Sequence, residues 1–174
     1  MNKALTSRPL TQMEFEQYEK ELLIWYTEEL ITSGICTPEN AEATAKEDIV
    51  RLCPNGLESP NCYFQYLLSD KNEEIGFLWY CLRKIDELEE KDIIFICDVK
   101  IFEVYRGQGY GRALMEYVEA ETRNHNLDKI ILNVFDKNEV AKNLYTSMGY
   151  EVIHEGIGSA AMLKNLSWNS SLAI

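Results

Sequence analysis

The sequence predicts a single domain of the α/β class, in which a mixed β-sheet carries helices on both faces. Apolar residues change repeatedly between strand-like and helix-like spacing, in the order βααβββαβαββ. A glycine-rich turn also joins a strand to a helix near the middle of the chain, as in many α/β proteins that bind anions. The length of 174 residues suits one domain, which we place at residues 1–165, followed by a loose tail at 166–174.

The first part of the chain predicts a short strand and two helices. Residues 4–10 form the candidate strand, and apolar residues then recur at spacings of three and four between Thr11 and Gly34. The apolar face of this helix carries Phe15, Tyr18, Leu22, Trp25, Tyr26 and Leu30. Thr11 and Glu14 have the spacing of a capping box, and a second helix is predicted at 37–52 with Pro38 in its first turn.

The rest of the chain alternates strands and helices. Strands are predicted at 62–69, 75–83, 93–102, 129–134, 150–153 and 160–163, and helices at 109–123 and 138–148. Residues 84–92 carry five acids and two lysines, which is typical of an exposed loop.

Composition limits the function classes. The net charge of −12, from 29 acids and 17 bases, argues against binding nucleic acid; it suits a cationic substrate such as an amine, or serves solubility alone. No apolar run reaches transmembrane length and the N-terminus lacks an apolar signal segment, so we expect a cytoplasmic protein with no membrane partner. Five cysteines without Cys-x-x-Cys spacing indicate neither a disulfide framework nor a metal site, and Cys81 and Cys97 are expected to pack inside strands.

The glycine-rich turn is the most informative motif. Arg106-Gly107-Gln108-Gly109-Tyr110-Gly111 follows a strand and leads into a helix that begins with Arg112. Backbone N–H groups at such a turn, together with the helix dipole, favour a phosphate or pyrophosphate. The spacing does not fit a P-loop, because no lysine follows Gly111, or a dinucleotide fingerprint, because Arg112 stands where the third glycine is required.

Two motifs give the sequence its resemblance to a known family. The loop fits Arg/Gln-x-x-Gly-x-Gly/Ala, and downstream the chain has a strand, then Asn138, Ala141, Leu144-Tyr145 and Gly149-Tyr150. In this order the two motifs resemble the signatures of the GCN5-related N-acetyltransferase (GNAT) superfamily over about residues 92–152. The segment Pro54–Pro60 is similar to a bacterial subgroup whose substrates are largely unassigned.

The resemblance implies a fold, a cosubstrate and a set of residues. The fold would be a GNAT-type central mixed β-sheet, and the cosubstrate acetyl-coenzyme A, with no metal. Backbone groups of the strand and the loop would bind the coenzyme, and Asn138 would either contact it or only cap its own helix. The implied coenzyme-binding residues are Val99, Ile101, Arg106, Gly107, Gln108, Gly109, Tyr110, Gly111, Arg112 and Asn138.

The resemblance also places Tyr145 where family members carry the general acid. A phenol with a pKa near 10 carries its proton at neutral pH, so it can offer that proton to the sulfur as the C–S bond breaks. The alternative interpretation is packing, because Tyr145 shares a helix face with Ala141, Leu144 and Met148.

Asp98 is the candidate general base. It is the only ionisable residue in the apolar run 93–99, where an acid is costly without a partner or a task. Asp98 could accept the amine's proton, directly or through water, or it could anchor an ammonium group of the substrate. The alternative is a structural role, in which Asp98 pairs with a neighbouring arginine. Glu103 and His154 remain further options, and His125 is expected at the surface.

Together these observations predict an acetyl-coenzyme A-dependent N-acetyltransferase. We expect a primary amine, in a small molecule or a peptide, to attack the thioester directly, without an acyl-enzyme. The alternatives are a non-catalytic acyl-coenzyme A sensor and a transferase of another acyl group. A homodimer is possible, and the sequence does not identify the amine.

Overall fold

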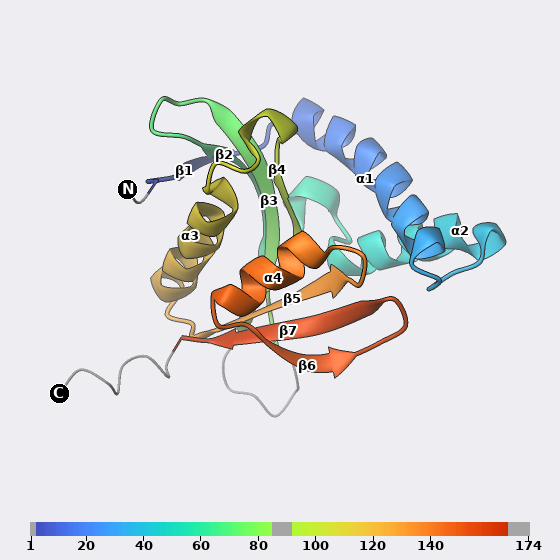
Figure 1. Ribbon diagram of the computed structural model, residues 1–174. Helices are drawn as coiled ribbons and strands as arrows, with labels where there is room; N and C mark the ends of the chain where they lie inside the picture. Colours follow the sequence, from blue (N-terminus) through green and yellow to red (C-terminus); the bar gives the residue numbers. More distant parts are fainter. Residues whose placement is uncertain (1–2, 85–91, 167–174) are drawn as a thin grey trace.

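The computed structural model describes residues 3–84 and 92–166 (Figure 1). The helices are α1 (Gln12–Thr32), α2 (Pro38–Leu52), α3 (Tyr110–Asn124) and α4 (Glu139–Ser147), with short 3-10 turns η1 (Gly56–Glu58) and η2 (Glu103–Tyr105). The strands are β1 (Thr6–Pro9), β2 (Cys62–Leu68), β3 (Glu74–Arg83), β4 (Ile93–Ile101), β5 (Lys129–Phe135), β6 (Glu151–Glu155) and β7 (Ser159–Asn165). All of the α-helices and strands were predicted, with ends that differ by a few residues, whereas the turns η1 and η2 were not.

The strands form one mixed sheet in the order β1-β2-β3-β4-β5-β7-β6. Among the described strands, only the central pair β4–β5 is parallel, and the crossover between these strands contains α3. Helices α3 and α4 cover one face of the sheet, and α1 and α2 cover the other (Figure 1). This arrangement confirms the predicted α/β class with helices on both faces.

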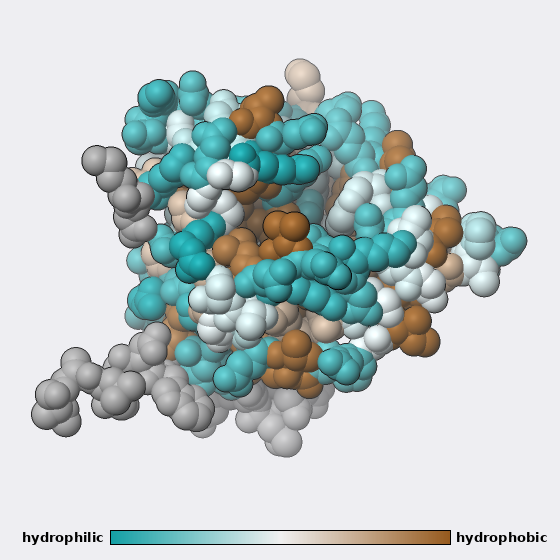
Figure 2. All heavy atoms as spheres, in the orientation of Figure 1, coloured by the Kyte–Doolittle hydropathy of each residue, from teal (hydrophilic) through white to brown (hydrophobic). Residues whose placement is uncertain are grey.

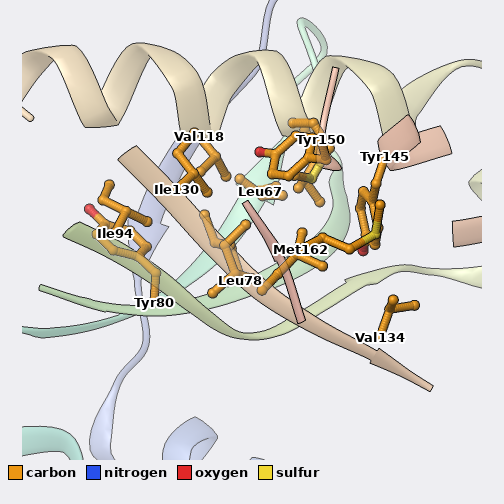
Figure 3. Close-up of a cluster of buried hydrophobic side chains, with 14 of the residues drawn as sticks. Leu67, Leu78, Tyr80, Ile94, Val118, Ile130, Val134, Tyr145, Tyr150 and Met162 are labelled. Carbon is orange, nitrogen blue, oxygen red and sulfur yellow. The ribbon is translucent and has the colours of Figure 1, made fainter. Parts of the chain in front are cut away.

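Each face has its own core. The core under α3 and α4 includes Leu78, Ile94, Val118 and Ile130, none of which is more than 1% exposed (Figure 3). The opposite core, under α1 and α2, is aromatic, with Phe15, Phe64 and Trp79 packed together. Strand residues alternate between the two cores, so the sheet is buried on both sides and its central strands are almost entirely apolar.

The predicted capping box begins α1. The Thr11 hydroxyl accepts from the Glu14 backbone N–H, while the Glu14 carboxylate accepts from the Thr11 N–H at 2.8 Å. Arg8 donates to the same carboxylate at 2.7 Å and also to Glu74. These contacts lower the pKa of Glu14 to about 2, chiefly through the hydrogen bond from Arg8. The start of α1 is therefore joined to β1 and β3.

The cysteine expectation was wrong in one respect. Cys62 and Cys81 face each other across β2 and β3, and the structure joins them in a disulfide. Cys97 is free, and its sulfur lies 3.6 Å from the Cys81 sulfur. The pairing arises from the register of the β2–β3 hairpin, which motif spacing along the chain does not reveal.

Two other expectations fall at the edges of the described residues. Most of the predicted charged loop, residues 85–91, and residues 167–174 of the predicted tail lie outside them. Leu166, where we placed the start of the tail, is buried in the core under α3, and its N–H donates to the Asp128 carbonyl at 2.6 Å.

A bulge in β4 determines where the sheet opens. Trp79 pairs with Asp98 and Tyr80 with Ile96, so Cys97 is an extra residue without a partner in β3. On the other side of β4, pairing with β5 extends only from Ile94 to Ile96. Strands β4 and β5 therefore separate at the bulge, and this separation positions the candidate site.

Candidate active site

The glycine loop has the geometry expected of an anion site. Gly107 and Gly109 have φ values of +70° and +85°, and an added Cβ at either position would meet no atom within 4 Å. Gly109 is the N-cap of α3, and the first intrahelical bond there runs from the Ala113 N–H to the Gly109 carbonyl. The N–H groups of the first-turn residues before Ala113 therefore make no intrahelical bonds. Such N–H groups can donate to a bound anion.

Gly111 has a different role from the other two glycines. A Cβ at this position would lie 3.2 Å from Cδ2 of Leu144, so its absence lets α3 and α4 approach closely. Arg112 reinforces this contact by donating to the Ser147 hydroxyl at 2.7 Å, and Arg106 donates to the Ile101 carbonyl at 3.0 Å. The loop is thereby held between the end of β4 and the end of α4.

The end of β4 presents an unpaired backbone edge. Val99 and Ile101 pair with Leu78 and Gly76 of β3, but they have no partners in β5. Their free side faces the gap between β4 and β5, near the start of the glycine loop. An extended ligand could add to this edge as a short extra strand.

Tyr145 lies on α4 at the edge of the core beneath α3 and α4, next to Met162 in Figure 3. Its side chain is 7% exposed, and its hydroxyl has no hydrogen-bonding partner among the described residues. Burial, together with the smaller effect of the nearby Asp98 charge, raises the pKa of Tyr145 to about 12. The phenol therefore carries its proton at neutral pH.

Asp98 occupies the bulge and points towards α1. Its Oδ2 accepts a hydrogen bond from the Tyr18 hydroxyl at 2.9 Å. Burial raises the pKa of Asp98 above its usual value, although the bond from Tyr18 acts in the opposite direction. The partner is thus a tyrosine of α1 and not the arginine of the alternative interpretation.

Sequence reasoning missed the bond between Tyr18 and Asp98. The helical pattern placed Tyr18 on the apolar face of α1, where it packs against Phe77 with a ring-centroid separation of 4.0 Å. Its bond to Asp98 spans 80 residues of sequence, so no local motif could reveal it. The only signal was a side chain with a polar tip on a face directed at the core.

Asn138 is the N-cap of α4. Its side chain accepts from the Ala141 backbone N–H at 3.1 Å, which confirms the capping interpretation. The side chain is exposed next to the end of β5, and a contact with the coenzyme remains a prediction.

The remaining candidate bases lie elsewhere. Glu103 is exposed on η2, and His154 is exposed on the edge strand β6. His125 was expected at the surface, but it is half-buried at the C-terminal end of α3, with its ring against Tyr63 and Tyr80. Asp98 is the charged group that shifts the pKa of Tyr145.

The glycine loop, the open edge of β4, Tyr145 and Asp98 surround the gap between β4 and β5. Figure 2 shows a hollow on this face of the molecule, between α4 and the turn that joins β4 to α3. A family model described as the acetyltransferase (GNAT) family matches residues 14–150, which include all of these features. The chain belongs to the GNAT family, and it is an N-acetyltransferase.

Relatives of this GNAT protein include two proteins of Bacillus subtilis. The chain is 30% identical over 147 residues to the uncharacterized N-acetyltransferase YdgE of Bacillus subtilis, covering 84% of this chain and 92% of that one. The crystal structure of the putative acetyltransferase YycN of Bacillus subtilis superposes with a TM-score of 0.79 at 27% identity, covering 88% and 96% of the chains.

A more distant structure shares the fold. The PaiA N-acetyltransferase of Thermoplasma acidophilum, solved in complex with coenzyme A, has a TM-score of 0.62 at 16% identity, covering 93% of this chain and 99% of that one. Within residues 3–84 and 92–166 of the present GNAT chain, no helix is long and apolar enough to cross a membrane. Over the same residues, no cluster of histidine, cysteine and acidic side chains is arranged to hold a metal ion.

Proposed function

We propose that this protein transfers an acetyl group from acetyl-coenzyme A to a primary amine in one direct step. The observation that carries the proposal is the opening between β4 and β5, which combines an unpaired strand edge and a glycine loop with Asp98, directed to the α1 face of the sheet. Coenzyme A in the complex of the distant PaiA relative supports the same cosubstrate.

Backbone groups would hold the cosubstrate. The loop from Gln108 to Arg112 offers N–H groups to the pyrophosphate, and the open edges of Val99 and Ile101 suit the amide groups of the pantetheine arm. Acetyl-coenzyme A supplies the activated thioester. The residues fit this ligand because no Cβ fills the space beside Gly107 and Gly109.

Asp98 and Tyr145 would handle the protons. The amine nitrogen attacks the thioester carbonyl, forming a C–N bond while the C–S bond breaks and its electron pair stays on sulfur. Asp98, whose pKa is raised by burial, accepts the proton lost by the amine. Tyr145 donates its phenolic proton to the thiolate, and the backbone N–H near Ile101 stabilises the oxyanion.

Cys97 is unsuited to a covalent route. It lies next to Asp98 in the bulge, but burial raises the pKa of its thiol well above the usual range. A thiol that keeps its proton is a poor nucleophile, so direct attack by the amine is favoured over an acyl-enzyme.

The test compares the wild type with Tyr145→Phe. We expect acetyl-coenzyme A to bind both proteins equally in calorimetry, while amine-dependent thiol release falls about 100-fold or more in the variant. Equal thiol release by the two proteins would remove Tyr145 as the acid. Binding without thiol release from any amine in a broad panel would contradict the catalytic proposal and favour an acyl-coenzyme A sensor.

A further inference from the structure

Three aromatic side chains meet where α1 passes the end of β5. The Phe135 ring centroid lies 6.1 Å from that of Trp25 and 6.3 Å from that of Tyr26, and the Trp25 and Tyr26 centroids are 6.4 Å apart. The planes of Trp25 and Phe135 are inclined at 77°. Trp25 is 44% exposed, so this aromatic cluster is open to solvent.

The aromatic cluster shares a face of the sheet with Asp98. Phe135 and the exposed Asn133 lie on the α1 side of β5, beyond the last residue that pairs with β4. On α1, Trp25 follows Tyr18 by seven residues, which is two turns and about 10 Å along the helix axis. The cluster and Asp98 thus lie on the same side of the opening, separated along α1 by about this distance.

The surroundings of the cluster are acidic. Glu21, Glu28 and Glu29 are three or four residues from Trp25, so they are its neighbours on the helix surface. The Tyr26 hydroxyl donates to Asp48 at 2.9 Å, which makes the Tyr26 ring more electron-rich. Both effects favour a cation and disfavour an anion at these rings.

Contacts at the end of α1 keep the cluster in place without a ligand. The Lys137 ammonium donates to the Thr32 carbonyl, which joins the segment after β5 to the last turn of α1. Gly158 in the β6–β7 turn lies so close to Ser33 that an added Cβ would be 2.2 Å from the Ser33 oxygen. Among residues 3–84 and 92–166, the cations that lie over aromatic rings do so elsewhere, as Lys3 does over Tyr110.

We propose that Trp25, Tyr26 and Phe135 bind a cationic group of the acceptor, about 10 Å from the amine that is acetylated. The proposal rests on the proposed function, because it assumes that the reacting amine lies at Asp98. It assigns the acceptor to amines that carry a second positive charge at the far end of an extended chain.

The test compares two acceptors that differ only in charge. Both carry a primary amine on an extended alkyl chain of about 10 Å, which ends in trimethylammonium in one and in the neutral tert-butyl isostere in the other. Calorimetry measures their binding to the protein saturated with coenzyme A, so that the result does not depend on turnover. We expect the charged acceptor to bind at least about fivefold more tightly.

Three variants of α1 make the result specific. Trp25→Leu should abolish the preference for the charged acceptor, and Trp25→Phe should retain part of it. Ile24→Ala changes the neighbouring residue, which is 63% exposed, and should leave the preference intact. Thermal unfolding checks that each variant is folded.

The outcomes separate this inference from the proposed function. Equal binding of the two acceptors, or a preference that survives in Trp25→Leu, would overturn the aromatic site even if both amines were acetylated. A preference lost in Trp25→Leu but accompanied by no thiol release would support the site and count against the transferase mechanism.

Discussion

At the scale of single residues, the buried pair Asp98–Tyr18 affects both the proposed reaction and the stability of the fold. Burial raises the folded pKa of Asp98 above its unfolded value, so folding is penalised when the carboxyl is ionised. The penalty is absent below the unfolded pKa and is fully present once the pH has risen past the folded pKa. A residue retained at such a cost is a candidate for a functional role.

Asp98→Asn tests this relation. The amide removes the buried charge but can still accept from Tyr18, so we expect a higher melting temperature than in the wild type at pH 7. The difference should vanish below the ordinary pKa of 3.8, where Asp98 is protonated. Thiol release should fall about 100-fold or more, because the base is lost. A variant that is less stable at pH 7 would show that the ionised carboxylate supports the fold.

Tyr18→Phe tests the hydrogen bond alone. The bond from Tyr18 lowers the pKa of Asp98, so its loss should raise that pKa and move the acid limb of the kcat/KM profile to higher pH. The high-pH plateau should change little. Tyr117→Phe is the matched control, since it removes a bond to Ser7 on the other side of the sheet. An unmoved acid limb in Tyr18→Phe would mean that Asp98 is not the base.

At the scale of the elements, the glycines in the turn from β4 to α3 serve both the backbone conformation and the proposed coenzyme site. Glycine is needed at Gly109 because φ is +85° there, a conformation that costs other residues about 1–2 kcal/mol. The same requirement exists at Gly34, where φ is +71°, after the end of α1. Comparing substitutions at the two positions therefore separates the effect of backbone strain from the effect on ligand binding.

Gly109→Leu and Gly34→Leu form a matched pair. Both should lose about 1–2 kcal/mol of stability from the same strain in denaturant unfolding. Only Gly109→Leu should also weaken acetyl-coenzyme A binding, by tenfold or more, because the side chain would enter the phosphate site. Equal coenzyme affinity in the two variants would refute the assignment of the loop.

The elements also show how far the sequence can be interpreted. The capping box at Thr11 and the cap at Asn138 depend on residues three positions apart, and both were predicted correctly. The bulge at Cys97 and the pairing of Cys62 with Cys81 depend on how separate strands align. A shift of one residue would change both, and local spacing contains no information on that register.

At the scale of the whole molecule, the site exists because distant segments converge at the gap between β4 and β5. The two family signatures located the loop and Tyr145, since each is contiguous in sequence. The bond from Tyr18 to Asp98 and the aromatic cluster around Phe135 join α1 to strands more than 75 residues away. These contacts follow from tertiary packing, so only the structure could show them.

In the proposed mechanism, the two substrates would approach the gap from different directions. The coenzyme would lie along β4 and the loop before α3, while the amine would enter beneath α1, next to Asp98. Both can then be bound together, and the acetyl group need not be held by the protein. The central claim is that transfer occurs within this ternary complex.

Initial velocities measured with both substrates varied test that claim most directly. With an acceptor identified by thiol release, reciprocal plots against acetyl-coenzyme A at several fixed amine concentrations should give intersecting lines, because both substrates must be bound before any product leaves. Parallel lines would contradict the account, since they would require an acetylated enzyme that forms before the amine binds.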